Sequence, residues 1–196
     1  MKLRYKITVG ILIFVFLFFS AVAVSISYTA DCPPAAEAAS GSTMKAVVYR
    51  CYGGPDVLEY ADIPMPVPAE HEVLVKVHAA GVNPLDWHFM RGSPFVMRLM
   101  TGIGAPKDAA LGRDFAGVVE AVGENVTRLK AGDRVYGGAN GAFAEYLVRR
   151  ETGSIALMPA NVSFEEAAAV PVAAITALQA LRDNGQLQAG QKVLIN

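Results

Sequence analysis

The side chains that could bind a metal in this sequence are few and far apart. They are two cysteines and three histidines, namely Cys32, Cys51, His71, His78 and His88. A structural zinc site needs four such ligands, usually in closely spaced pairs, and these spacings match no usual zinc motif. We therefore expect no structural metal. One disulfide between the two cysteines is possible, but the sequence holds no disulfide framework.

A second set of polar side chains lies in the stretch "GVNPLDWH". Asn83 precedes Pro84, and this dipeptide is a common start of a turn. Asp86 is expected to act as the N-cap of a short helix, where its carboxylate would accept a backbone hydrogen bond. Trp87 is more often a core or rim aromatic than a platform for a ligand. By themselves, these residues predict a capped helix.

Two further polar positions lie later in the chain. In "LGRD", Arg113 and Asp114 are adjacent, and a local ion pair between them is expected. Thr176 lies in an Ala-rich stretch, where its hydroxyl could bond back to its own helix backbone. Their spacing alone assigns no catalytic or binding role to any of these residues.

The elements that must position these residues begin with short strands. In residues 72–82, Val73, Val75 and Val77 alternate with polar side chains, as in a strand with one buried face. Similar runs, separated by turn residues, cover 45–50, 115–123, 133–138, 143–150 and 154–159. Strands at this spacing favour a barrel or a sandwich.

The pattern then changes to a helical one. "SFEE" predicts a capping box between Ser163 and Glu166, and Pro171 is expected to end one helical segment and start another. That second helix should end at Gly185. The closing "GQKVLIN" predicts a buried strand over 193–195. A helix, a Gly turn and an apolar strand are typical of the start of an α/β nucleotide-binding unit.

The N-terminal segment is strongly apolar. Residues 1–6 carry three positive charges, and residues 7–28 carry none. As a helix, 7–28 would be about 33 Å long, enough for a hydrocarbon core of roughly 30 Å. Residues 1–28 are therefore predicted to anchor the chain in a lipid bilayer by a single helix. A cleaved secretory signal ending at "AVA" (21–23) is the alternative, less favoured because the apolar run continues beyond it.

Composition and charge divide the rest of the chain. Residues 29–43, rich in Pro, Ala, Ser and Gly, are predicted to be a flexible linker. A β-rich domain should cover 44–160, and 161–196 should start an α/β domain. The chain has 17 Lys and Arg against 18 Asp and Glu. That balance gives no basic patch for nucleic acid.

Five stretches between residues 44 and 196 occur in the order found in the medium-chain dehydrogenase/reductase superfamily, and they resemble its zinc-independent quinone oxidoreductase branch most. They are "MKAVVYRCYGGPDVLEYADIPMPVP", "HAAGVNPLDWHFMRG", "LGRDFAGVVEAVGENVTRLKAGDRVYG", "GAFAEYLV" and "SFEEAAAVPVAAITALQAL". The resemblance implies a mainly β fold with helices: a GroES-like barrel domain, then the truncated start of a Rossmann-type domain. In that branch "GQKVLIN" leads into a Gly-rich turn that holds the cofactor phosphates. We therefore expect residues 1–196 alone to be inactive.

The resemblance also separates zinc enzymes from zinc-free ones. The zinc alcohol dehydrogenases have a Cys in the "GVC" turn and a His in "GHE". This sequence has Asn83 and Arg113 at those positions. An amide is a poor zinc ligand, and a guanidinium has no free lone pair. We therefore expect no catalytic zinc.

Site residues follow from the resemblance only. It implies that Asn83 and Thr176 contact the cofactor, NADP or NAD, at its nicotinamide end. It places substrate near Asp86, Trp87 and Phe143, between the two domains. No catalytic residue can be assigned from the sequence.

The implied function is transfer of a hydride from NAD(P)H to a quinone or an α,β-unsaturated carbonyl. Without zinc, fixed hydrogen-bond donors must stabilise the negative charge that develops on the acceptor oxygen. The alternative is a non-catalytic, membrane-tethered barrel that binds a partner or an apolar ligand. A homodimer is possible.

Two indications disagree on the side of the membrane on which the domain lies. The positive-inside rule places Lys2, Arg4 and Lys6 in the cytoplasm and the domain outside it, whereas nicotinamide cofactors are cytosolic.

Overall fold

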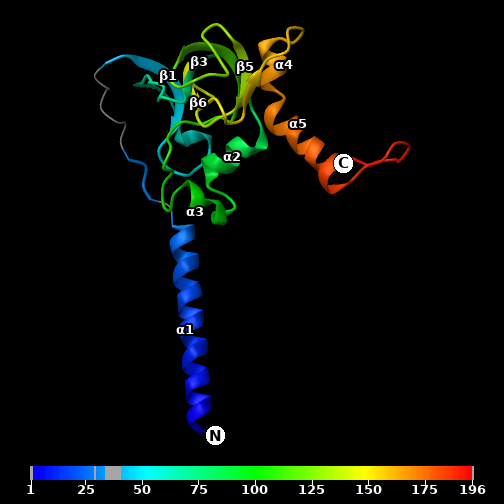
Figure 1. Cartoon of the computed structure of the whole chain (residues 1–196). Coiled ribbons are helices and arrows are strands. Elements are labelled where there is room, and N and C mark those ends of the chain that lie inside the picture. Colours follow the sequence, from blue (N-terminus) through cyan, green and yellow to red (C-terminus); the bar gives the residue numbers. More distant parts are fainter. Residues whose placement is uncertain (1, 29, 34–40, 196) are drawn as a thin grey trace.

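Seven antiparallel strands form the framework of the chain between Thr43 and Leu157 in the computed structural model, which describes residues 2–28, 30–33 and 41–195 (Figure 1). One sheet has five strands in the order β6-β3-β4-β5-β7, and β1 and β2 pair separately. The bounds are β1 Thr43–Tyr49, β2 Leu58–Pro64, β3 Glu72–Gly81, β4 Asp114–Val122, β5 Arg134–Gly138, β6 Tyr146–Arg150 and β7 Ile155–Leu157.

The core forms where the alternating strands turn their apolar faces inward. Val73 and Val75 of β3 are fully buried against Phe115 and Val119 of β4 and Val135 of β5. The smaller sheet joins this core through backbone contacts, such as the bridge between residues 46 and 144. The predicted mainly β domain is therefore confirmed.

Two strand predictions differ from the structure. No strand was predicted over β2. None of its side chains is buried, so its sequence lacks a clear apolar face. The strand predicted over 143–150 begins only at Tyr146. Phe143 instead exchanges backbone hydrogen bonds with β1 and with residue 111.

Short helices connect and flank the strands. They are η1 Pro55–Val57, α2 Pro84–Arg91, η2 Phe95–Met97, α3 Arg98–Thr101, α4 Phe164–Ala168, α5 Pro171–Leu178 and the π-helical η3 Gln179–Asn184. The predicted capping box is confirmed: the Ser163 hydroxyl accepts from the Glu166 amide, and the Glu166 carboxylate accepts from the Ser163 amide. The helix break at Pro171 and the end at Gly185 are also confirmed.

The predicted closing strand is not formed. Residues 193–195 belong to no strand, and Leu194 is 92% exposed. A strand of a parallel sheet needs a neighbour to complete its hydrogen bonds. The described residues provide none beside this segment, which therefore projects from the domain with α5 and η3 (Figure 1).

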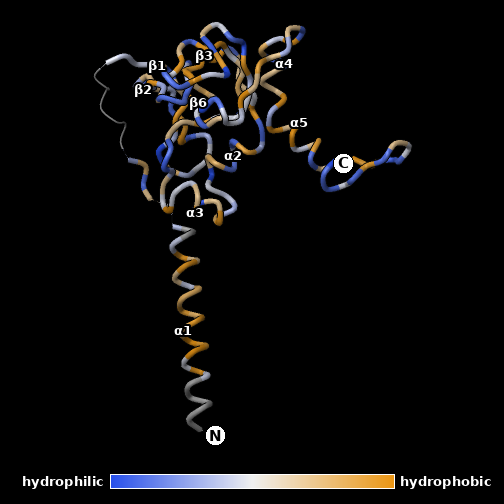
Figure 2. The backbone as a smooth tube through the Cα atoms, in the orientation of Figure 1, coloured by the Kyte–Doolittle hydropathy of each residue, from blue (hydrophilic) through white to orange (hydrophobic). Residues whose placement is uncertain are grey.

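Helix α1, Lys2–Ser27, projects from the domain as a single long rod (Figure 1). Its segment Thr8–Ser25 has a mean hydropathy of 2.5, and none of it is buried. Figure 2 shows the hydrophobic colour running around this helix rather than along one side. Among the described residues, it is the one helix long and apolar enough to cross a membrane.

The segment after α1 is attached to the domain by hydrogen bonds and by a disulfide. The amide of Ala30 donates to the carbonyl of Gly104 (3.0 Å). Cys32 forms a disulfide with Cys51, with 4.9 Å between their Cα atoms. Residues 34–40 lie outside the described residues. The flexible linker predicted for 29–43 is therefore anchored at its start.

Candidate functional site

Helix α2 organises the site, and its N-terminus is tightly defined. The Asn83 side chain accepts from the Leu85 amide (3.1 Å), and Asp86 Oδ2 accepts from the Asn83 amide (2.9 Å). Pro84 occupies the first helical position, where its missing N–H costs nothing. The prediction that Asp86 is the N-cap is wrong in detail. Asn83 is the N-cap, and Asp86 is the third helical residue (N3), whose side chain completes the capping box.

Two cavities border α2. The α5 cavity measures about 590 Å³ and lies between α5 and the strands β5 and β7; its lining includes Leu85, Asp114, Tyr136, Gly137, Gly138, Ser154, Ile155, Val172, Ile175 and Thr176. The α3 cavity measures about 270 Å³; it is lined by Tyr49, Phe89, Met97, Met100, Thr101, Lys107, Asp108, Ala110, Arg113 and Asn140. Leu85 and Phe89 are one helical turn apart on α2, so the same helix borders both cavities.

Arg113 and Asp114 also divide between the cavities. Arg113 lines the α3 cavity, donates to Asn140 and lies over the Phe89 ring, 3.5 Å from its centroid. Asp114 lines the α5 cavity and accepts from the Val172 amide of α5 (3.0 Å). The predicted ion pair between Arg113 and Asp114 is not formed, although the structure describes both side chains. Because successive residues of a strand point to opposite faces, the two groups separate at the start of β4.

Asp86 and Asp114 form a buried acidic pair. Asp86 is 4% exposed and Asp114 is 2% exposed, and in each the Oδ1 atom has no hydrogen-bond partner among the described residues. Burial raises the pKa of Asp86, opposed by its bond from the Asn83 amide and by the charge of Arg113. Burial also raises the pKa of Asp114. The Val172 amide opposes this rise, and the nearby charge of Asp86 adds to it.

Burial and neighbouring charges shift the pKa values of two residues that line the α3 cavity. Burial lowers the pKa of Arg113, and the neighbouring Tyr49, Asp86 and Asp108 oppose that change. Burial raises the pKa of the Tyr49 hydroxyl to about 12. A guanidinium stays charged in proteins. The α3 cavity therefore combines the fixed positive charge of Arg113 with an apolar wall that includes Met97 and Met100, and Lys107 and Asp108 also line it.

The structure brings some predicted site residues together and separates others. Thr176 and Asp114 share the α5 cavity, and the Asn83 amide group approaches Asp114 Oδ2 at 3.5 Å. Trp87 is partly exposed and stacks on His88, and Phe143 packs beside the buried cluster around Tyr49. Neither of these two aromatics lines the α5 or the α3 cavity.

The sequence did not reveal the role of Asp114 as the contact between β4 and α5. It treated Arg113 only as a lost zinc ligand and as an ion-pair partner of Asp114. The available signal was the pairing of a cation and a carboxylate at a strand start, where neighbouring side chains diverge. Within the described residues, no three His, Cys, Asp or Glu side chains are grouped closely enough to hold a metal ion.

Comparisons with known proteins place this geometry in a family. Residues 69–180, more than half of the chain, match the family described as the alcohol dehydrogenase GroES-like domain. The human quinone oxidoreductase is 36% identical over 156 residues, which cover 78% of this chain and 45% of that protein.

Solved structures agree with this match. The quinone oxidoreductase from Coxiella burnetii superposes with a TM-score of 0.68 at 34% identity, over 76% of this chain and 47% of that one. The Escherichia coli quinone oxidoreductase complexed with NADPH gives 0.61 at 31% identity, over 71% and 41%. This chain thus spans somewhat less than half the length of these relatives. The chain belongs to the alcohol dehydrogenase GroES-like domain family, within the medium-chain dehydrogenase/reductase superfamily.

Proposed function

We propose that this protein is a membrane-anchored oxidoreductase that uses NAD(P)H to reduce a quinone or an α,β-unsaturated carbonyl without zinc. The observation that carries the proposal is the division of polar groups at α2. Asp114 and Thr176 line one cavity, and Arg113 lines the other. Relatives named quinone oxidoreductase support the same class of reaction.

The α5 cavity suits the nicotinamide end of the cofactor. Several of its walls are glycine, alanine or backbone, which leaves room for a flat ring. Asp114 Oδ1 is buried without a partner among the described residues, so it is available to accept from an amide or a hydroxyl. Thr176 adds a hydroxyl on the α5 side. Asn83 would approach from the α2 side, which gives both residues the cofactor contacts that the resemblance implied.

The cofactor would supply the hydride. The α3 cavity would receive the acceptor, because its walls are apolar and adaptable. Arg113 is held there by Phe89 and Asn140 before any ligand arrives, so its N–H groups are preorganised. Such a donor in a dry cavity stabilises negative charge that develops on a carbonyl or quinone oxygen.

The division of the chain into domains is part of the same proposal. Residues 44–160 would form the substrate domain, and 161–196 would begin the cofactor domain through α4 and α5. Helix α1 would anchor the protein in the bilayer. The acceptor would not touch Asp86, Trp87 or Phe143. These residues would act on it only by holding α2 and the cluster around Tyr49 in place.

The test is a reduction assay with the intact, full-length protein in detergent or in vesicles. We expect nicotinamide absorbance to fall when NADPH and a benzoquinone are both present, and the rate to be unchanged by metal chelators. NADPH that binds without being oxidised by quinones or enones would contradict the proposed reaction. If NADPH and NADH both fail to bind, the non-catalytic barrel becomes the better interpretation.

A further inference from the structure

Five large apolar side chains in the segment around α3 lie at the surface. Each is more than half exposed, and Met100 is 85% exposed. We call them the α3 patch: Phe95, Val96, Leu99, Met100 and Ile103. Isolated exposed apolar residues are ordinary, but five within nine positions are a contiguous surface that calls for a partner.

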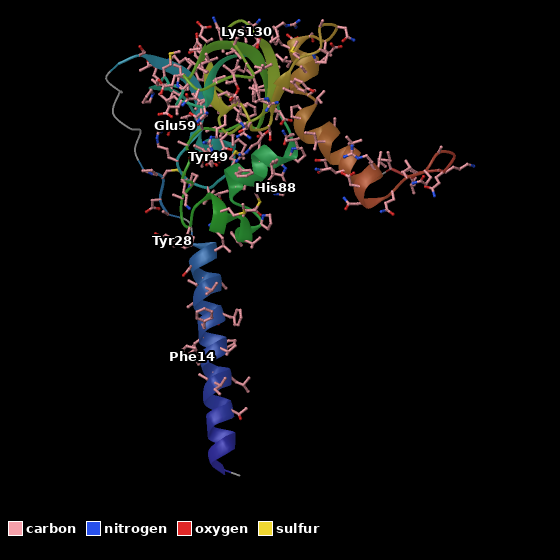
Figure 3. The ribbon with its side chains drawn as sticks, viewed as in Figure 1. Phe14, Tyr28, Tyr49, Glu59, His88 and Lys130 are labelled. Atoms are coloured by element: carbon pink, nitrogen blue, oxygen red, sulfur yellow. A yellow bond between two sulfur atoms is a disulfide. The ribbon has the colours of Figure 1, made fainter. Side chains whose placement is uncertain are left out.

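The α3 patch lies beside the end of helix α1. The Arg98 guanidinium donates to the carbonyl of Tyr28 (2.7 Å), the residue that follows α1, and Ala30 bonds to Gly104. Figure 3 shows Tyr28 at the junction of α1 with the domain and Lys130 at the opposite end. A bilayer spanned by α1 would therefore have its surface next to this patch and far from the other end of the domain.

The segment that carries the patch exposes no charge. Arg98 is the one charged residue from Ser93 to Ala105, and it is 3% exposed. Its Nε atom donates to the carbonyl of Gly92, and its guanidinium lies over the rings of Tyr52 and Phe95. The charge is therefore satisfied inside the domain, and the outer surface of the segment is left apolar.

Basic residues flank the patch on both sides. Arg91 and Lys107 are exposed at the two ends of the segment, and the exposed Asp108 follows Lys107. Long cationic side chains at the edge of an apolar surface are typical of the membrane interface, where their stems contact acyl chains and their charges contact headgroups.

The patch and the α3 cavity share a wall. Met100 belongs to both. Met97, three residues earlier at the end of η2, also lines the cavity. An apolar molecule in contact with the patch would therefore lie at the rim of the cavity that contains Arg113.

We propose that the α3 patch inserts into the interface of the bilayer that α1 spans, and that the α3 cavity receives its acceptor from the lipid phase. The acceptor class is then a quinone or enone carrying a long apolar chain. This inference depends on the anchoring role of α1 in the proposed function. A lipid surface is the chosen occupant because the patch is fixed by hydrogen bonds to the residues that leave α1.

The test measures depth in the bilayer with a fluorescent label. The full chain, disulfide intact, is labelled at Met100→Cys with a polarity-sensitive dye and reconstituted into phosphatidylcholine vesicles. Val67→Cys is the matched control, because Val67 is also 85% exposed and lies after β2, away from α1. We expect a blue shift and quenching by nitroxide lipids at position 100, and quenching only by aqueous iodide at position 67.

Other outcomes would overturn the inference in distinguishable ways. Equal iodide quenching at both positions would show that the patch faces water while α1 still anchors the protein. Protection from both quenchers at position 100, with energy transfer between labelled copies, would assign the patch to a second copy of this chain. Release of the protein by alkaline carbonate would refute the anchor itself, and would leave the reduction assay in detergent unaffected.

The route of the acceptor has its own readout. Val96→Asp with Leu99→Asp places charge on the patch without altering a residue that lines the cavity. We expect the double variant to lose several-fold in rate with a long-chain quinone in vesicles and to keep its rate with a water-soluble benzoquinone. An unchanged ratio of the two rates would refute acceptor supply from the lipid phase.

Discussion

Arg113 and Asp114 are consecutive residues that face different cavities, and this separation defines the chemistry available at each. A cation among apolar walls can polarise a carbonyl oxygen, whereas a buried carboxylate can only accept a hydrogen bond or hold a proton. The arrangement suits two ligands of different polarity, one in each cavity that α2 borders.

Replacing Arg113 tests its role at the acceptor. In the intact enzyme we expect Arg113→Met to lower kcat on the order of 10²-fold, the usual loss for one donor to a developing oxyanion. The dissociation constant for NADPH should not change, because Arg113 lines the other cavity. Arg113→Lys, which keeps the charge, should retain more of the rate. Steady-state kinetics and NADPH fluorescence titration supply the two measurements, and an unaltered kcat in Arg113→Met would exclude this role.

The raised pKa of Asp86 predicts a specific dependence of stability on pH. A carboxyl whose folded pKa lies above its ordinary value of 3.8 contributes stability that is complete below that pH. This contribution is lost as the pH rises through the raised pKa. Asp86→Asn keeps the acceptor for the Asn83 amide but carries no charge at any pH. We therefore expect the Tm of Asp86→Asn, relative to that of the wild type, to increase as the pH is raised from about 3 to about 7.

Thermal unfolding at several pH values, followed by circular dichroism, measures this difference. Asp56→Asn is a suitable control because Asp56 is exposed. A gap in Tm between Asp86→Asn and the wild type that does not vary with pH would argue against a buried, charge-bearing Asp86.

At the scale of elements, the cap of α2 is predicted to contribute to stability separately from any contact with a ligand. Asn83→Ala removes the side-chain acceptor for the Leu85 amide and should cost about 1 kcal/mol. Asn83→Ser should restore most of that stability, because serine is also a good N-cap. If the amide group also contacts the cofactor, Asn83→Ser will keep its Tm and still bind NADPH more weakly. Equal NADPH affinity in wild type and Asn83→Ser would limit Asn83 to the capping role.

The end of β3 approaches α4 so closely that it requires glycine. A Cβ atom on Gly81 would lie 2.5 Å from the Ala168 carbonyl oxygen and 3.3 Å from Asp114 Cβ. Gly81→Ala should therefore destabilise the domain by about 1–3 kcal/mol, as overpacking does. Gly138→Ala is the control, since its Cβ would meet no atom closer than 3.8 Å. Denaturant unfolding of both variants measures the contrast, and equal midpoints would contradict this contact.

The sequence predicted elements well where the signal was local. The capping box at Ser163, the break at Pro171 and the alternation of Val73 and Val75 each depend on a few neighbouring residues, and each is confirmed. The sequence failed over 193–195 because a strand exists only beside a partner strand.

The candidate site was harder to predict for a similar reason. The distance from Asp114 to Val172 spans 58 positions, and nothing in either stretch indicates that they meet. Likewise, Arg113 was predicted to pair with Asp114, but the two side chains diverge where β4 begins and line separate cavities. Only the family resemblance connected Asn83 with Thr176.

At the scale of the whole molecule, the disulfide links the N-terminal segment to the domain and bears on location. A bond between cysteines 19 positions apart is worth about 3 kcal/mol by loop closure. Replacing both Cys32 and Cys51 by serine should therefore lower the Tm of the protein, measured without reductant. A double variant as stable as the wild type would show that this cross-link does not stabilise the fold.

If α1 spans a bilayer as proposed, the same cysteines test on which side of it the domain lies. Stable disulfides form mainly in oxidising compartments, in agreement with the orientation that the N-terminal charges predict. We expect both thiols in intact cells to resist alkylation until a reductant is added. Ready alkylation without reductant would place the domain in a reducing compartment, where nicotinamide cofactors are abundant.

The attachment of residues 28–32 to the domain has a consequence for how the protein would meet its acceptor. Two hydrogen bonds and a covalent cross-link fix the domain to the end of α1, so the domain would have little freedom to tumble if α1 anchors it as proposed. Encounters would then occur by lateral diffusion in a plane, at a constant height and with one fixed orientation. Turnover under such conditions should follow the number of acceptor molecules per unit area of membrane, and diluting the vesicles in buffer should leave it unchanged.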